Sequence, residues 1–166
     1  MPLRFGILTV SDRSSRGERP DSSGPVIISM VEEQGGKIIQ VDIVPDEIAE
    51  IQKKLSEWSD QNGIDVILTT GGTGFSPRDI TPEATRGVVE RMTPGIAEAM
   101  RAESLKITPH AMLSRGTAGI RGRTLIINLP GSPKAARENL AVVLPVLPHA
   151  TALLQDDVNA EAGHRI

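Results

Sequence analysis

Cysteine and tyrosine are both absent from this chain of 166 residues. Without a thiol the chain has no disulfide framework, no thiolate zinc site and no cysteine nucleophile, and it fits a reducing compartment. One Trp and two Phe are also too few for a surface that stacks nucleic-acid bases. We therefore expect neither nucleic acid as a partner nor a structural zinc ion.

A strong excess of charge of one sign is missing as well. The 18 basic and 21 acidic residues give a formal net charge of -3. A chain of this kind has no global electrostatic field that would hold a polyanion, so an anionic ligand has to be held by local groups.

Long hydrophobic runs are scarce. The most apolar stretch, Leu140 to Leu154, contains two prolines and one histidine and is shorter than a bilayer-spanning helix. Arg4, Asp12 and Arg13 precede any long apolar stretch, so no secretory segment is expected. We expect a cytoplasmic protein with no membrane partner.

The length of the chain and its hydrophobic content of 39% predict a single compact domain, which we place at residues 1–154. Residues 155–166 have little apolar content, and we expect them to form a flexible C-terminal tail.

The first 70 residues alternate between short β-branched runs and amphipathic stretches. This order of strand, helix, strand, helix, strand, with right-handed crossovers, predicts a parallel sheet with helices on both faces. Ligands of such sheets gather at the carboxyl ends of the strands. The predicted strands are 4–12, 37–44 and 65–70, and the predicted helices are 24–34 and 48 to about 63.

The second half of the chain adds helices and a hairpin. We expect an α/β fold, a three-layer sandwich with a mostly parallel central sheet and a small hairpin extension. The exposed edge of the hairpin is a candidate contact surface between subunits. The predicted helices are 82–92, 94–105 and 133 to about 154, and the predicted hairpin strands are 112–120 and 123–128.

The segment 68–82 says most about function. A buried strand runs into a glycine loop, which leads to a helix with Thr81 as its predicted cap and Pro82 as its first residue. Glycines leave backbone amides uncovered, and amides next to a helix start bind phosphate. The candidate binding residues of this loop are Thr70, Gly71, Gly72, Thr73, Gly74 and Ser76.

Two acidic residues complicate a simple phosphate site. Asp79 lies in the glycine segment beside Arg78, and Asp46 follows the second strand. Carboxylates beside a phosphate raise the local negative charge unless a divalent cation lies between them, so we infer a magnesium-bound phosphate ligand. Structural roles compete: Asp46 can cap the next helix, Asp79 can stabilise its turn, and the glycines can serve tight packing. The cap already offered by Thr81 favours a functional Asp79.

Five segments taken together resemble the MogA family of molybdopterin adenylyltransferases, which includes the G domains of gephyrin and of its plant counterpart. The resemblance spans roughly residues 4–154, with the motifs in the same order. It departs from the family pattern at Ser22, where the family often has a basic residue, and at 116–118, which is variable. The segments are 44–47, 69–82, 94–100, 113–115 and 128–132.

The resemblance implies a homotrimeric α/β enzyme that activates molybdopterin with ATP and Mg²⁺ as cofactor, releasing pyrophosphate before molybdate insertion. Asp46 and Asp79 correspond to the family's catalytic aspartates and are candidate magnesium ligands. A MoeA-like protein that inserts molybdate is an implied partner, and neither haem nor flavin is implied.

The implied chemistry fits the residue types. A phosphate nucleophile arrives ionised and needs no general base, and the three histidines show no spacing typical of a triad or metal site. Arg78, Arg115 or Lys134 could neutralise phosphate oxygens. The candidates for the pterin phosphate or the pterin edge are Ser114, Asn128, Pro130, Gly131 and Ser132.

Two other functions remain open on the sequence alone. One is a molybdopterin-binding or scaffolding module with little turnover, and the other is a different magnesium-nucleotide enzyme on the same scaffold. Retention of both Asp46 and Asp79 favours the adenylyltransferase.

Overall fold

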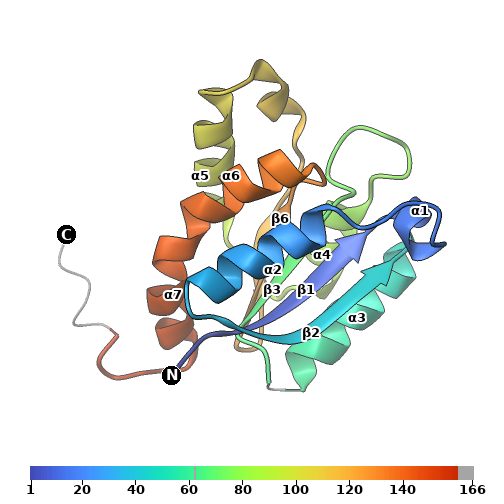
Figure 1. The fold of residues 1–166 in the computed structure, drawn as a ribbon. Coiled ribbons are helices and arrows are strands. Elements are labelled where there is room, and N and C mark those ends of the chain that lie inside the picture. The colour runs from blue at the N-terminus through green and yellow to red at the C-terminus, as the bar shows by residue number, and fades with distance from the viewer. Residues whose placement is uncertain (62, 161–166) are drawn as a thin grey trace.

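The computed structural model describes residues 1–61 and 63–160. Within them a six-stranded sheet has the order β2-β1-β3-β6-β5-β4, with helices packed on both of its faces (Figure 1). This confirms the predicted α/β architecture. The strands are β1 (Arg4–Val10), β2 (Lys37–Val44), β3 (Val66–Thr70), β4 (Arg91–Met92), β5 (Ala118–Arg121) and β6 (Thr124–Leu129).

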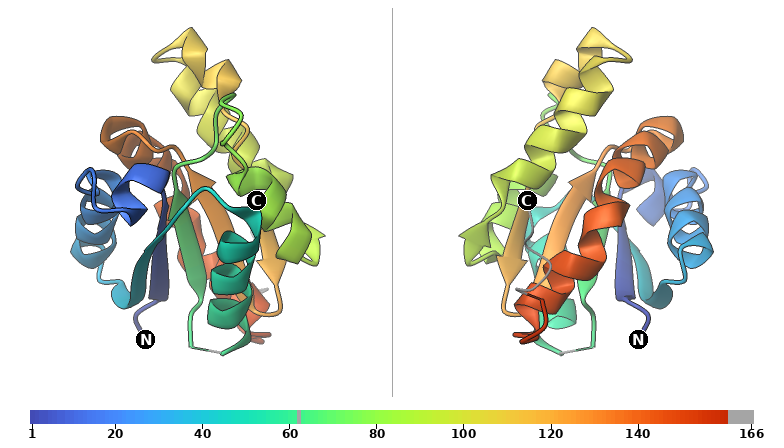
Figure 2. Two further views of the ribbon diagram at one scale, coloured as in Figure 1. Left: turned by 90° about the vertical axis from the view of Figure 1, so that its right-hand side faces the viewer. Right: turned by 90° about the vertical axis from the view of Figure 1, so that its left-hand side faces the viewer.

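The helices form two layers. Figure 2 shows α2 and α6 on one face of the sheet and α3 and α4 on the other. The α-helices are α1 (Asp12–Ser15), α2 (Ser23–Glu33), α3 (Ile48–Asp60), α4 (Thr81–Val88), α5 (Pro94–Leu105), α6 (Pro133–Val143) and α7 (Leu147–Leu154). Two 3₁₀ helices, η1 (Pro109–Leu113) and η2 (Leu144–Val146), complete the elements.

The central strands supply both halves of the hydrophobic core. β1 pairs in parallel with β2 and β3, and β3 pairs in parallel with β6. Because side chains alternate along a strand, Leu68 and Ile127 pack with the core beneath α2 and α6, while Ile67 and Ile126 pack beneath α3 and α4. The strands are thus fixed from both faces, which holds the loops at their carboxyl ends in place.

Several predicted boundaries are wrong near prolines and at the sheet edge. The last helix is interrupted because Pro145 and Pro148 lack an amide hydrogen, so α6, η2 and α7 replace one continuous helix. The helix predicted at 82–92 is α4, which ends at Val88, because 91–92 pair with β5 as strand β4.

The hairpin also differs from its prediction. Its first strand starts at Ala118, and 109–113 form a 3₁₀ helix. β5 pairs antiparallel with β6 on one side and with β4 on the other. The expected free hairpin edge is therefore wrong, because the short strand β4 forms that edge of the sheet.

The last two features concern the arm formed by α5 and η1 and the end of the chain. α5 and η1 project beyond the carboxyl ends of the strands (Figure 2). The predicted tail at 155–166 lies partly outside the described residues, which stop at 160. Each helix within residues 1–61 and 63–160 is too short or too polar to cross a membrane.

Candidate active site

A pocket of about 440 Å³ opens at the carboxyl ends of the central strands. Its lining includes Asp46 after β2, Asp79 in the loop after β3, and the glycine turns that follow β3 and β6. Parallel strands end at the same edge of a sheet, which brings together residues far apart in the sequence. The structure therefore places both predicted aspartates at one pocket. The predicted binding residues that also line it are Thr70, Gly71, Gly72, Gly131 and Ser132.

Close packing requires the glycines of this pocket. Gly71 and Gly72 have φ angles of 100° and 68°, which L side chains rarely adopt. A Cβ on Gly71 would lie 2.3 Å from the carbonyl oxygen of Val10, and one on Gly72 would lie 2.3 Å from Oγ1 of Thr81. The tight packing that the sequence analysis gave as an alternative role for these glycines is therefore confirmed. It does not exclude a role in binding.

The backbone amides of the glycine turns are not equivalent. The amide of Gly71 donates to the carbonyl of Leu129 at 3.3 Å, so it is already used. Among the residues that the structure describes, the amides of Gly72, Gly131 and Ser132 have no hydrogen-bond acceptor. These three residues line the pocket, and their amides are the donors that an anion can use.

Thr81 does not cap α4, so that prediction is wrong. The helix begins at Thr81, its N-cap position is Ile80, and no side chain caps it. The hydroxyl of Thr81 instead donates to the carbonyl of Gly71 at 2.9 Å. Thr81 thus ties the helix start to the glycine turn.

Asp79 also stabilises its own turn. Its Oδ2 accepts a hydrogen bond from the amide of Ser76 at 3.0 Å. The cap at Thr81 is absent, so the argument that this cap leaves Asp79 free for function is wrong. Asp79 nevertheless lines the pocket, and its position there supports a functional role.

Asp46 is held by a neighbouring aspartate rather than by the helix that follows it. The N-cap of α3 is Glu47, which makes no side-chain cap bond, and Oδ2 of Asp46 accepts from the amide of Asp12 at 2.9 Å. Burial raises the pKa of the Asp46 carboxyl, and the negative charges of Asp12 and Asp79 add to this effect. A bound cation would offset the repulsion between the Asp46 carboxylate and these neighbouring negative charges.

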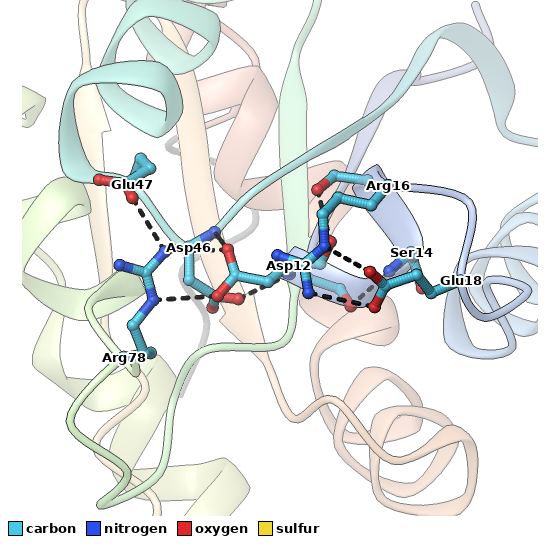
Figure 3. A network of polar contacts seen from close by, with 9 residues as sticks. Asp12, Ser14, Arg16, Glu18, Asp46, Glu47 and Arg78 are labelled. Carbon is cyan, nitrogen blue, oxygen red and sulfur yellow. Dashed lines mark hydrogen bonds and ion pairs between the residues drawn. The ribbon is translucent and has the colours of Figure 1, made fainter.

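Arg78 crosses from the glycine segment to the other two loops (Figure 3). Its Nε and Nη2 donate to the two carboxylate oxygens of Asp12 at 2.9 and 3.0 Å, and Nη2 also donates to Glu47 at 2.9 Å. This pairing lowers the pKa of Asp12. Arg78 is therefore committed to carboxylates of the protein.

Arg115 is committed in the same way. Its guanidinium donates to the carbonyls of Gly74 at 2.8 Å and Asp79 at 2.7 Å, and it forms an ion pair with Glu83. It therefore anchors the glycine segment from outside the pocket. Lys134 does not line the pocket; it is exposed and lies 3.8 Å from Glu138.

Other predicted binding residues do not line this pocket. Asn128 is buried, and its side chain is fully engaged with Thr69, Thr85 and the amide of Thr117. Ser114 lines a second pocket of about 520 Å³ beneath α5. The remaining predicted residues outside the first pocket's lining are Thr73, Gly74, Ser76 and Pro130.

One wall of the pocket is missing from the sequence-based prediction. Residues 19–22, between α1 and α2, and Ser23, the first residue of α2, form this part of the lining. They follow the carboxyl end of β1 just as the other loops follow β2 and β3, and this position in the predicted sheet is a signal that could have identified them. Asp21 holds this wall in place by accepting from Thr9 Oγ1 at 2.8 Å and from the amide of Gly24 at 3.1 Å.

The two aspartates fit Mg²⁺ as it is usually bound. This ion takes one or two protein carboxylates and completes its shell with water and substrate phosphates. Within the described part of the chain, no group of three or more metal-ligating side chains occurs. A magnesium ion here would be shared between Asp46, Asp79 and a bound phosphate.

Comparisons with known proteins identify the family of this chain. A family described as a probable molybdopterin binding domain matches residues 6–149. A molybdopterin adenylyltransferase of Helicobacter pylori is 46% identical over 154 residues, covering 92% of this chain and 88% of that protein. The solved structure of the molybdopterin biosynthesis enzyme MoaB from Thermus thermophilus has a TM-score of 0.88 and 54% identity, covering 93% of this chain and 98% of that one.

A gephyrin of Dictyostelium discoideum is 52% identical over 159 residues, which cover 90% of this chain. The chain spans 22% of the length of that gephyrin. Since the family match covers most of the chain and the fold agrees with it, this chain belongs to the molybdopterin-binding domain family that also contains gephyrin and the molybdopterin adenylyltransferases.

Proposed function

We propose that this protein acts in molybdenum cofactor biosynthesis as a molybdopterin adenylyltransferase, transferring AMP from ATP to the terminal phosphate of molybdopterin. The observation that carries the proposal is the meeting of Asp46, Asp79 and the glycine turns at one pocket. The similarity to molybdopterin adenylyltransferases supports the choice of substrates.

The reaction needs positioning more than proton transfer. An oxygen of the pterin phosphate forms a bond to the α-phosphorus of ATP, and the bond from that phosphorus to the oxygen bridging to the β-phosphate breaks. The electron pair of the broken bond leaves with pyrophosphate. Nucleophile and leaving group are both anionic, so the protein has to align two polyanions and offset their charge.

The residues of the pocket fit these tasks. The amides of Gly72, Gly131 and Ser132 can donate to phosphate oxygens, and they approach from two separate turns. Asp46 and Asp79 would hold Mg²⁺, which when bound supplies charge neutralisation and a template for the phosphates. Thr81 ties the turn after β3 to α4, and Thr70 ties the turn after β6 to β3, so these groups need little reorganisation when substrate binds.

The test is pterin-dependent release of pyrophosphate from ATP in the presence of Mg²⁺. We expect Asp79→Asn to abolish turnover while pterin binding is largely retained, because the pterin does not need the charge of this residue. Asp60→Asn is the matched control, since Asp60 is exposed and pairs with Arg121 far from the pocket. Equal turnover of Asp79→Asn and wild type would refute the assigned role.

The same assay separates the other two functions. Tight pterin binding without pyrophosphate release by the wild-type protein would identify a binding or scaffolding module. Pyrophosphate release that does not depend on the pterin would identify a different magnesium-nucleotide enzyme.

We also propose that the protein assembles as a homotrimer through the projecting arm formed by α5 and η1. Large apolar side chains lie exposed on this arm, and an exposed apolar patch marks an interaction surface. Light scattering coupled to size exclusion should give three times the mass of the chain, and Met112→Glu should shift it towards the monomer. The exposed side chains are Leu105, Ile107, Met112 and Leu113. A MoeA-like protein that inserts molybdate remains a proposed partner.

A further inference from the structure

We infer that Arg19 is the side chain that grips a substrate phosphate in the candidate active site. The inference rests on the proposed function for the identity of the substrates, and it adds a residue that the sequence analysis did not single out. The ligand group is a phosphate, carried either by the nucleotide or by the pterin.

The charges of the pocket call for a cation. Its lining contains three carboxylates, those of Asp21, Asp46 and Asp79, and one guanidinium, that of Arg19. Two phosphate-bearing substrates would add more negative charge to this lining. A cation at the acidic pair offsets part of that charge, and the wall formed by residues 19–23 needs its own positive group to hold an anion.

The arginines beside the pocket are already used. Arg78 is held by Asp12 and Glu47, and each of these contacts is 2.9 to 3.0 Å long. Arg115 donates to two backbone carbonyls and pairs with Glu83. Transfer of either guanidinium to a substrate would break contacts that hold the glycine segment.

Arg19 has no comparable commitment. Its guanidinium makes one hydrogen bond among the described residues, from Nη2 to Oγ of Ser11, at a long distance of 3.4 Å. Asp21, two residues away, is occupied by Thr9 and the amide of Gly24 instead of Arg19. Arg19 is exposed and retains several donors for a planar, bidentate contact with phosphate oxygens.

Further donors surround Arg19 on this side of the pocket. Ser22 lines the same wall, and its side chain makes no capping hydrogen bond with α2. The unpaired amides of Gly131 and Ser132 belong to the same lining. A phosphate held by Arg19 would thus meet hydroxyl and amide donors in addition to the guanidinium.

Equilibrium binding tests this inference without any turnover. ADP with Mg²⁺ and molybdopterin are titrated separately into the wild-type protein and into Arg19→Ala. We expect Arg19→Ala to weaken one of the two ligands by about 10- to 100-fold, the usual effect of losing a charge-assisted hydrogen bond. The ligand that weakens identifies which substrate carries the phosphate.

Two further variants separate charge from loop structure. Arg13→Ala removes the same charge from the same segment, but Arg13 does not line the pocket, so both affinities should stay at the wild-type level. In the double variant Arg19→Ala with Ser22→Arg, a guanidinium returns to the same wall and should restore most of the lost affinity. The affinity of the double variant should fall as salt is added, because salt screens the contact between the guanidinium and the phosphate.

The outcomes are decisive for Arg19 whatever the reaction is. Equal affinities of Arg19→Ala and Arg13→Ala for both ligands would overturn the inference, and so would a double variant that restores nothing. If Arg19→Ala weakens binding but the wild-type protein releases no pyrophosphate, the proposed adenylyl transfer is refuted while the inferred contact between Arg19 and phosphate is supported.

Discussion

Asp12 and Asp46 exchange hydrogen bonds across the ends of β1 and β2. The amide of Asp12 donates to Oδ2 of Asp46 at 2.9 Å, and the amide of Asp46 donates to Oδ1 of Asp12 at 3.0 Å. Arg78 then grips both oxygens of Asp12 (Figure 3). Three loops are locked together by this arrangement, and the remaining Asp46 oxygen is left beside Gly72.

The reciprocal pair predicts that Asp12 positions Asp46 without itself contacting a substrate. In Asp12→Ala the amide of Asp46 loses its acceptor and Arg78 loses its bidentate partner. We expect turnover to fall by about 10- to 100-fold, as is typical when a group that orients a metal ligand is removed. The concentration of Mg²⁺ needed for half-maximal rate should rise as well.

Asp12→Asn is the informative comparison, because it keeps the acceptor for the Asp46 amide. It should retain more activity than Asp12→Ala. A magnesium requirement unchanged in Asp12→Ala would argue against a positioning role.

Gly72 should not tolerate a side chain. Gly72→Ala combines a φ of 68° with a Cβ that would lie 2.3 Å from Thr81 Oγ1. The left-handed backbone costs about 1 to 2 kcal/mol, and overpacking adds about 1 to 3 kcal/mol. Gly122→Ala is the control, since its φ is 57° and no atom lies within 4 Å of its Cβ. Denaturant unfolding should show the larger loss for Gly72→Ala; equal losses would contradict the packing argument.

Asn128 should contribute to folding rather than to ligand binding. Its Nδ2 donates to Thr69 at 3.0 Å and Thr85 at 2.9 Å, and its Oδ1 accepts from Thr117 at 3.2 Å. Asn128→Ala leaves buried polar groups without partners, each costing about 1 to 3 kcal/mol. We expect a lower free energy of unfolding in the absence of ligand. Wild-type stability combined with lost pterin binding would support direct contact with the pterin instead.

The ion pair between Lys54 and Asp42 should give a small stability that depends on pH. Their side chains lie 2.6 Å apart, and Lys54 lowers the pKa of Asp42 in the folded protein. This carboxyl therefore contributes stability above its unfolded pKa of about 3.9, and the contribution is lost as the pH falls through its lowered folded pKa. Asp42 is 40% exposed, so solvent screens the pair.

Lys54→Met should accordingly lose about 0.2 to 1 kcal/mol of unfolding free energy at pH 7. The difference from wild type should shrink at a pH below the folded pKa of Asp42. Lys53→Met removes the same charge from the exposed side of α3 and should show no such dependence. A loss of equal size at both pH values would mean that packing, rather than charge, is responsible.

Much of the fold follows from local patterns. Apolar runs fix β1 and β3 within a few residues, because a strand buried on both faces has to be apolar at successive positions. The edge strand β2 is largely exposed, and its β-branched residues mark it instead. The glycine loop and the two aspartates could be placed at one pocket because parallel strands end at one edge. Boundaries were wrong where a proline interrupts a helix or where two residues pair at a sheet edge, as in β4.

The partners of the charged side chains could not be predicted in the same way. Arg78 pairs with Asp12, 66 residues away, and with Glu47, 31 residues away. Its position beside the glycine loop suggested a phosphate ligand, yet its contacts are to the protein. A long charged side chain pairs with groups that the tertiary structure brings close to it, and local sequence spacing does not predict which groups these are.

The sequence by itself determined the alternation of elements, the glycines at positive φ and the presence of acidic residues after two strands, since each depends on near neighbours along the chain. Only the tertiary structure decided which cations are used internally and which one faces the pocket. The sequence alone does not distinguish Arg19, Arg78 and Arg115. In the folded protein, groups from distant loops accept several hydrogen bonds from Arg78 and Arg115, whereas Arg19 makes a single long hydrogen bond.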